Sequence, residues 1–219
     1  MNHIPGIAVC IWDFDGTLYR PTPALTQAIV EADYELIMRH TGWDKAKTVE
    51  EFHKIFKIKT PSSTETAAIL AGISVQEAAI ECELYKDRRP FLSRNQRLID
   101  MFNALKGYAH YFLVNGIVEK VRESLAVLGV QPDIFREIVT AELVGVNKPQ
   151  PDGFRYILRK TGLPPEVHLM IGDREAVDLA PAKSVGMHTC LVSWGLTKPQ
   201  TGNVDNVIEE IYTVPDLLI

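Results

Sequence analysis

The order of apolar and polar positions along the chain predicts two different kinds of segment. The short apolar run at 7–12 (IAVCIW) is rich in β-branched residues and is closed by a turn signal, which predicts a buried strand. Beyond it, apolar residues recur at helical spacing and predict helices at 24–41, 49–58, 61–72 and 74–85. Ser74 followed by Glu77 is a capping-box signature for the last of these helices. No strand pattern interrupts this part of the chain, so it predicts a small helical bundle inserted after the first strand.

The pattern changes again near residue 92, after which strands and helices alternate. The predicted strands lie at 109–114, 138–140, 168–171, 189–192 and 204–208. Helices are predicted at 95–105, 117–128 and 154–161, from the loop after 173 to about 185, and at the C-terminal end. This alternation is typical of a parallel sheet that is covered on both faces. We therefore expect an α/β protein with a doubly wound parallel sheet, formed by 1–19 and 90–219, and an all-helical domain at 20–89.

Composition and charge narrow the functional class. The chain has 219 residues, 46% of them hydrophobic, and a net charge of −5, which argues against a general nucleic-acid surface. No apolar run reaches membrane-spanning length, and the N-terminal residues lack the features of a signal peptide. The three cysteines are far apart and form no CxxC pair, so neither a zinc site nor a disulfide framework is indicated. We expect a cytoplasmic protein, either monomeric or homodimeric, with no nucleic-acid or membrane partner.

Polar residues follow the predicted strands at the points where the strands end. They are Asp13 and Asp15, Asn115 and Gly116, Lys148, Asp173 and Asp178. Because the carboxyl ends of parallel strands meet at one edge of a sheet, these side chains are expected to converge on one crevice. Four carboxylates and one lysine leave excess negative charge, which Mg²⁺ bound through oxygens would offset. Such a site suits phosphoryl transfer. The Asp-x-Asp-Gly-Thr sequence taken alone is equally compatible with an ordinary strand-to-loop exit.

Three of these segments carry a family resemblance. DFDGTL at 13–18, Lys148 before a proline, and GDREAVD at 172–178 resemble motifs one, three and four of the haloacid dehalogenase (HAD) superfamily. The position of the helical insertion, directly after motif one, resembles the C1 cap of that superfamily. The resemblance implies a Rossmannoid core with a helical cap. It covers essentially the whole chain.

The resemblance also implies roles for individual residues. Asp13 would be the nucleophile that accepts the phosphoryl group, Asp15 the general acid/base, and Lys148 the cation that stabilises nucleophile and phosphate. Asp13, the backbone carbonyl of Asp15 and Asp173 would hold Mg²⁺, and Asp178 would support the metal site or orient the lysine. The presence of Asp15 implies phosphate chemistry, since the family's dehalogenases lack that acid.

Motif two departs from the family pattern. Relatives often have TNG there, whereas this chain has LVNG, which puts Val114 at the position of a phosphate-binding hydroxyl. Losing one donor would weaken phosphate binding by about 1–3 kcal/mol unless another group replaces it, for which Asn115 and the nearby backbone amides are candidates. The substrate is expected to contact Gly16, Thr17, Asn115, Gly116 and Arg20. We expect Arg88, Arg89 and Arg94 to be solvated surface charges.

The sequence therefore predicts a Mg²⁺-dependent phosphatase that hydrolyses a small phosphorylated metabolite through an aspartyl-phosphate on Asp13. Two alternatives stay open. A phosphomutase would use the same chemistry and return the phosphate to its substrate. A non-catalytic binding or regulatory module would keep the fold alone, and only Val114 favours it.

Overall fold

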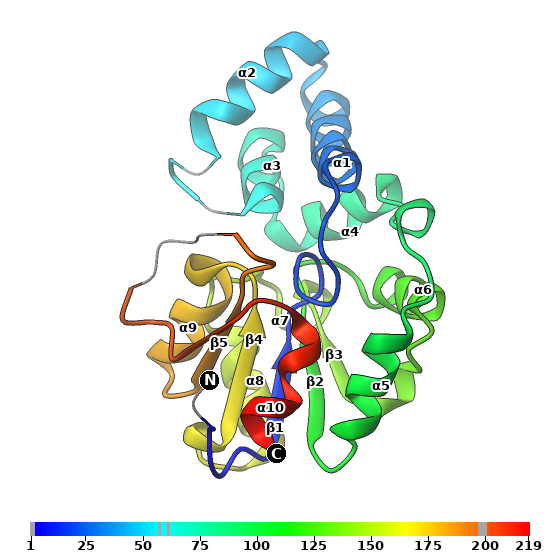
Figure 1. Cartoon of the computed structure of the whole chain (residues 1–219). Coiled ribbons are helices and arrows are strands. Elements are labelled where there is room, and N and C mark those ends of the chain that lie inside the picture. Colours follow the sequence, from blue (N-terminus) through cyan, green and yellow to red (C-terminus); the bar gives the residue numbers. More distant parts are fainter. Residues whose placement is uncertain (1–2, 57, 61, 197–200) are drawn as a thin grey trace.

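The central feature of the protein is a parallel β-sheet with the N-terminal strand in its middle (Figure 1). The computed structural model describes residues 3–56, 58–60, 62–196 and 201–219. In spatial order the strands are β3 (Phe135–Val139), β2 (Ala109–Leu113), β1 (Val9–Trp12), β4 (His168–Gly172), β5 (His188–Val192) and β6 (Asn206–Ile208). All five neighbouring pairs are parallel. The strand order reverses between β1 and β4, so the crevice expected of an open α/β sheet lies directly beyond β1.

Helices cover both faces of the sheet because its central strands are apolar on both sides. Cys10 and Trp12 of β1 belong to an apolar cluster with α5 (Gln96–Ala104), α6 (Val118–Leu128) and α10 (Pro215–Leu218). The alternate residues, Val9 and Ile11, belong to a second cluster with α8 (Asp152–Thr161) and α9 (Ala180–Ser184). The predicted doubly wound sheet is confirmed.

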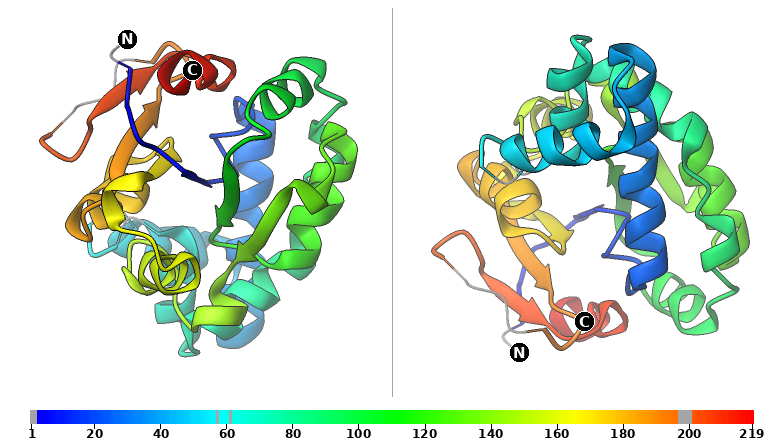
Figure 2. Two further views of the ribbon diagram at one scale, coloured as in Figure 1. Left: turned by 90° about the horizontal axis from the view of Figure 1, so that it is seen from below. Right: turned by 90° about the horizontal axis from the view of Figure 1, so that it is seen from above.

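The helical insertion packs around an apolar cluster of its own. It consists of α1 (Pro23–Thr41), α2 (Lys45–Ile55), α3 (Ser63–Ala71) and α4 (Val75–Tyr85). Seen from above, these helices lie across the carboxyl edge of the sheet (Figure 2). The predicted capping box of α4 is present, with Ser74 and Glu77 bonded reciprocally. Residues 57 and 61, which fall in the predicted segments 49–58 and 61–72, lie outside the described residues. We propose 20–89 as the limits of this cap domain.

Several short elements were not predicted. They are α7 (Ala141–Val144) and the single turns η1 (Arg89–Phe91), η2 (Pro132–Ile134), η3 (Pro165–Val167) and η5 (Ile211–Thr213). The helix predicted to end near 185 consists of a π-helical turn, η4 (Glu175–Leu179), that continues into α9. Within the described part of the chain, no helix is both long enough and apolar enough to cross a membrane.

Candidate active site

Lys148 joins two carboxylates at the carboxyl edge of the sheet. Asp13 follows β1 directly, and its backbone amide donates to Ile171 O of the neighbouring strand at 2.9 Å. The Lys148 ammonium donates to Asp13 Oδ1 and to Asp178 Oδ1, both at 2.7 Å. All three side chains are buried. The structure thus brings together three predicted residues that are up to 165 positions apart in the sequence.

The same edge holds an acidic group that fits a hard divalent cation. Carboxylate oxygens of Asp13, Asp173 and Asp178 lie within 4.8 Å of one another. Oxygen donors of this kind are the ligands that Mg²⁺ prefers. The Asp15 carboxylate accepts hydrogen bonds from Arg88 and is not part of this acidic group. Only the backbone carbonyl of Asp15 is therefore left for the metal role that the resemblance implies.

Two glycines make this close approach of acids possible. A Cβ on Gly16 would lie 2.7 Å from Asp173 Oδ2, and the φ of Gly16 is +86°, in the left-handed region. A Cβ on Gly172 would lie 2.5 Å from the Asp178 Cβ. Both positions therefore require the absence of a side chain, because the carboxylates occupy that space.

Burial and charge act on the nucleophile candidate in opposite directions. Burial, and then the neighbouring Asp178, raise the pKa of Asp13, while Lys148 opposes this rise. Burial also favours the neutral amine of Lys148, but Asp13 and Asp178 outweigh it and raise the pKa of the lysine. The ammonium therefore stays charged beside the two carboxylates. A bound cation would favour the ionised form of Asp13 further.

Asp15 is held by a buried arginine. Arg88 Nε donates to Asp15 Oδ1 at 2.9 Å, Arg88 Nη2 donates to Asp15 Oδ2 at 2.8 Å, and the Tyr19 hydroxyl donates to Asp15 Oδ1. Burial alone would raise the pKa of Asp15, but the charge and hydrogen bonds of Arg88 outweigh it and lower that pKa. The prediction that Arg88 is a solvated charge is therefore wrong, since only 5% of it is exposed. Arg89 and Arg94 are exposed as predicted.

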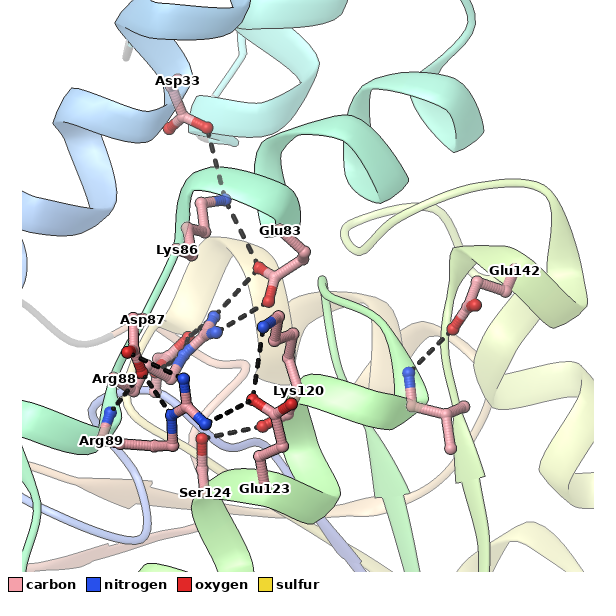
Figure 3. Close-up of polar contacts among 12 residues, drawn as sticks. Asp33, Glu83, Lys86, Asp87, Arg88, Arg89, Lys120, Glu123, Ser124 and Glu142 are labelled. Carbon is pink, nitrogen blue, oxygen red and sulfur yellow. Dashed lines mark hydrogen bonds and ion pairs between the residues drawn. The ribbon is translucent and has the colours of Figure 1, made fainter.

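The Arg88 contact continues into the helical insertion as a chain of buried charges (Figure 3). Arg88 Nη1 donates to Glu83 Oε2 of α4 at 2.7 Å. Lys86 Nζ lies 3.6 Å from Glu83 Oε1 and 3.4 Å from Asp33 Oδ1 of α1. Opposite charges thus alternate from Asp15 to Asp33. No spacing in the sequence indicates this arrangement.

A cavity of ≈320 Å³ opens beside Asp15 between the sheet edge and the insertion. Gly16 and Asn115, two of the predicted substrate contacts, line it. Asn115 also exchanges two hydrogen bonds with the Lys148 backbone, each 2.8 Å long, so its amide group is committed to positioning the lysine loop. The Thr17 hydroxyl donates to Asp13 Oδ2 at 2.9 Å.

The remaining predicted contacts lie elsewhere. Gly116 is buried near Glu83, and Arg20 is exposed and lines neighbouring cavities, one of which also reaches Asp173. Val114 is buried in the apolar cluster that contains Cys10 and Trp12. Its backbone amide continues the pairing of β2 with β3.

Trp194 is a positioning residue that sequence reasoning did not single out. Its indole Nε1 donates to Gly16 O at 2.6 Å, which ties the loop after β5 to the loop that carries Asp13 and Asp15. A tryptophan in a loop carries no signal for the backbone carbonyl that it will contact.

A family model and curated relatives both match this chain. The model of the haloacid dehalogenase-like hydrolases matches residues 7–186. The chain is 36% identical over 206 residues to the glyceraldehyde 3-phosphate phosphatase of Methanocaldococcus jannaschii, a match that covers 86% of each chain. It is 34% identical over 136 residues to the protein of the same name from Methanothermobacter thermautotrophicus, where the match covers only 59% of each chain.

Solved structures share the fold. The HAD phosphatase of Thermococcus onnurineus superposes with a TM-score of 0.68 at 21% identity, covering 96% of this chain and 97% of the other. At this level of identity the likeness establishes the architecture alone. Together with the family model, which spans most of the chain, these findings identify the protein as a member of the haloacid dehalogenase-like hydrolase family.

Proposed function

We propose that this hydrolase is a Mg²⁺-dependent phosphatase that cleaves a small phosphomonoester through an aspartyl-phosphate on Asp13. The observation that carries the proposal is the pairing of the Asp13 carboxylate with the Lys148 ammonium, at 2.7 Å, inside the group of acids at the sheet edge. The relatives named as phosphatases of glyceraldehyde 3-phosphate and of phosphoserine support a phosphomonoester as substrate. The three buried free cysteines support a reducing, cytoplasmic setting.

The reaction would take place in two steps at this edge. In the first, an Asp13 carboxylate oxygen bonds to phosphorus, the bond from phosphorus to the ester oxygen breaks, and that oxygen takes a proton from Asp15. In the second, water attacks the phosphorus of the acyl phosphate and gives a proton to Asp15, which releases inorganic phosphate and restores the Asp13 carboxylate. Arg88 holds Asp15 in its charged form, which is the form that the second step needs.

Other residues of this chain would hold the transferring group. Lys148 places a positive charge against the nucleophile, and Thr17 fixes the second oxygen of Asp13. Asp178 orients Lys148 from the opposite side. Mg²⁺, held by Asp13, Asp173 and the Asp15 carbonyl with Asp178 in support, would neutralise charge on the phosphoryl oxygens.

The test is phosphate release from a panel of phosphomonoesters with Mg²⁺, for the wild type and for Asp13→Asn. We expect release by the wild type and none above background for Asp13→Asn or after chelation. Asp133→Asn serves as the matched control, because it makes the same change at an exposed site outside the Asp15 cavity and should keep wild-type release. Release that survives in Asp13→Asn would contradict the proposed nucleophile. A phosphorylated intermediate whose phosphate returns to an added acceptor without release would favour a phosphomutase. Failure of every compound despite Mg²⁺ binding would favour a non-catalytic module.

A further inference from the structure

The cavity beside Asp15 contains a buried ammonium whose hydrogen-bonding capacity is unused. Lys86 lines this cavity and is only 5% exposed. Its Nζ lies 3.4 Å from Asp33 Oδ1 without a hydrogen bond, and 3.6 Å from Glu83 Oε1, which is too long for one. Among the residues described by the structure, the Lys86 ammonium thus has charge partners but donates no hydrogen bond. A buried donor in this state gains when an acceptor is supplied.

A second unpaired polar group lies on the wall of the same cavity. Thr64, in the first turn of α3, is 4% exposed and lines the cavity, and its hydroxyl has no hydrogen-bond partner in the described part of the chain. Ser62 caps α3 and Ser63 begins it, and both also line the cavity. The backbone amides of Ser63 and Thr64 have no acceptor within the helix, as at any helix start. The nine-residue helix α3 therefore presents donors to the cavity from the side of the insertion.

The charge around Lys86 indicates what kind of group these donors would accept. Asp33 and Glu83 already neutralise the Lys86 ammonium, and Glu83 and Asp15 together neutralise Arg88. Asp173 and Arg174, which also line the cavity and lie 3.8 Å apart, add one charge of each sign. A substrate carboxylate at this place would therefore meet four carboxylates against three cations. An uncharged oxygen would gain the unused hydrogen bonds without that repulsion.

We infer that Lys86 and Thr64 form a specificity subsite for an uncharged hydroxyl or carbonyl oxygen at the carbon end of the substrate. This inference rests on the proposed function, because it treats the Asp15 cavity as the substrate site. The substrate class is then a phosphorylated polyol or carbonyl compound and not a phosphorylated carboxylic acid. The cavity volume of ≈320 Å³ is at the small end of ligand sites, which favours a short carbon chain.

The test compares three phosphomonoesters that differ only at the third carbon: propyl phosphate, 3-hydroxypropyl phosphate and 3-phosphooxypropanoate. For the wild type with Mg²⁺ we expect kcat/KM to be highest for the hydroxyl compound, by about threefold to tenfold over propyl phosphate, which is the effect of one hydrogen bond. Thr64→Val keeps the side-chain shape and should bring the ratio of hydroxypropyl to propyl close to one. Lys86→Met should lower the same ratio.

Thr48→Val is the matched control. Thr48 is also buried, lies in α2, and donates a hydrogen bond to Asp44 O outside this cavity, so Thr48→Val should keep the wild-type ratio. Because Lys86→Met leaves Asp33 without its cation and can unfold the insertion, Thr64→Val decides the outcome. An unchanged ratio in Thr64→Val, or a wild type that turns over the carboxylate fastest, overturns the inference.

A protein that does not catalyse phosphate release can be told apart from a protein that lacks the subsite. If the wild type releases no phosphate, calorimetry of Asp13→Asn with the three compounds still measures the subsite. Tighter binding of 3-hydroxypropyl phosphate than of the other two, lost in Asp13→Asn/Thr64→Val, supports the subsite without catalysis. Equal affinities for the three compounds overturn it.

Discussion

Replacing Arg88 with methionine removes the cation between two carboxylates while keeping most of the side-chain volume. Arg88 Nη1 and Nη2 contact Glu83 at 2.7 and 3.1 Å, and the Glu83 side chain is 1% exposed. Removing one partner of a buried ion pair costs about 3–5 kcal/mol, because the remaining charge is left unpaired. The lost contact with Asp15 adds little to this loss of stability, since 30% of the Asp15 side chain is exposed and water can solvate it. Lys86 remains 3.6 Å from Glu83, so we expect a loss near the lower end, about 3 kcal/mol.

The neighbouring Arg89 provides the control for this change. Half of its side chain is exposed, and its partners Asp87 and Glu123 are solvated as well. Arg89→Met should therefore leave the free energy of unfolding almost unchanged. Urea unfolding of both variants, followed by circular dichroism in Mg²⁺-free buffer, measures the difference. Equal stabilities of Arg88→Met and Arg89→Met would refute the reasoning. Recovery of part of the loss in Arg88→Met/Glu83→Gln would support it, because that variant removes both charges of the buried pair.

Three further predictions concern the loop after β1 and the end of β2. Gly16→Ala should abolish Mg²⁺-dependent activity, because its Cβ would lie 2.7 Å from Asp173 Oδ2; calorimetric Mg²⁺ binding equal to that of the wild type would contradict this. Val114→Thr should raise turnover by adding a phosphate donor while lowering stability by about 1–3 kcal/mol, since Val114 packs among apolar residues; unchanged or lower turnover would show that Val114 does not weaken phosphate binding. The lowered pKa of Asp15 should stabilise the fold at neutral pH, and this contribution should be lost as the pH falls below about 4 and through the lowered folded-state value. Urea unfolding of the wild type and Asp15→Asn between neutral pH and pH 3 should therefore give a stability difference that shrinks at the acid end, and a constant difference would be evidence against the lowered pKa.

The fold was predictable where one periodicity dominated a segment. The central strands are apolar on both faces, so continuous runs such as 7–12 located them. The edge strand β3 begins at Phe135, before the predicted start at 138, because Arg136 and Glu137 on this strand are not buried and break the apolar run. The short turns η2 and η3 each contain too few residues to establish a helical period.

The candidate site likewise contains residues that the sequence could predict and a residue that it could not. Asp13, Lys148 and Asp178 were predicted to converge because each lies beyond a strand of one parallel sheet, and the structure brings them within hydrogen-bond distance. Arg88 and Arg89 are identical in type and adjacent in sequence, yet one is buried and the other exposed. What separates them is a contact between residues 73 positions apart, which no local pattern encodes.

The segment after α4 links the acid/base candidate to the interior of the helical insertion. Within three residues of one another, Lys86 contacts Asp33 of α1 and Arg88 contacts Asp15 beside the sheet. Any displacement of the insertion relative to the sheet therefore has to move the Arg88 guanidinium or break its hydrogen bonds to Asp15. In the reaction proposed above, the first step would need a proton on Asp15, whereas the Arg88 contact favours the charged form. That step would therefore require the Arg88 guanidinium to move away from Asp15. The second step would need the carboxylate, which the same contact favours. In that reaction, the position of the insertion and the protonation of Asp15 would be coupled through Arg88, because the two steps would require opposite states of its contact with Asp15.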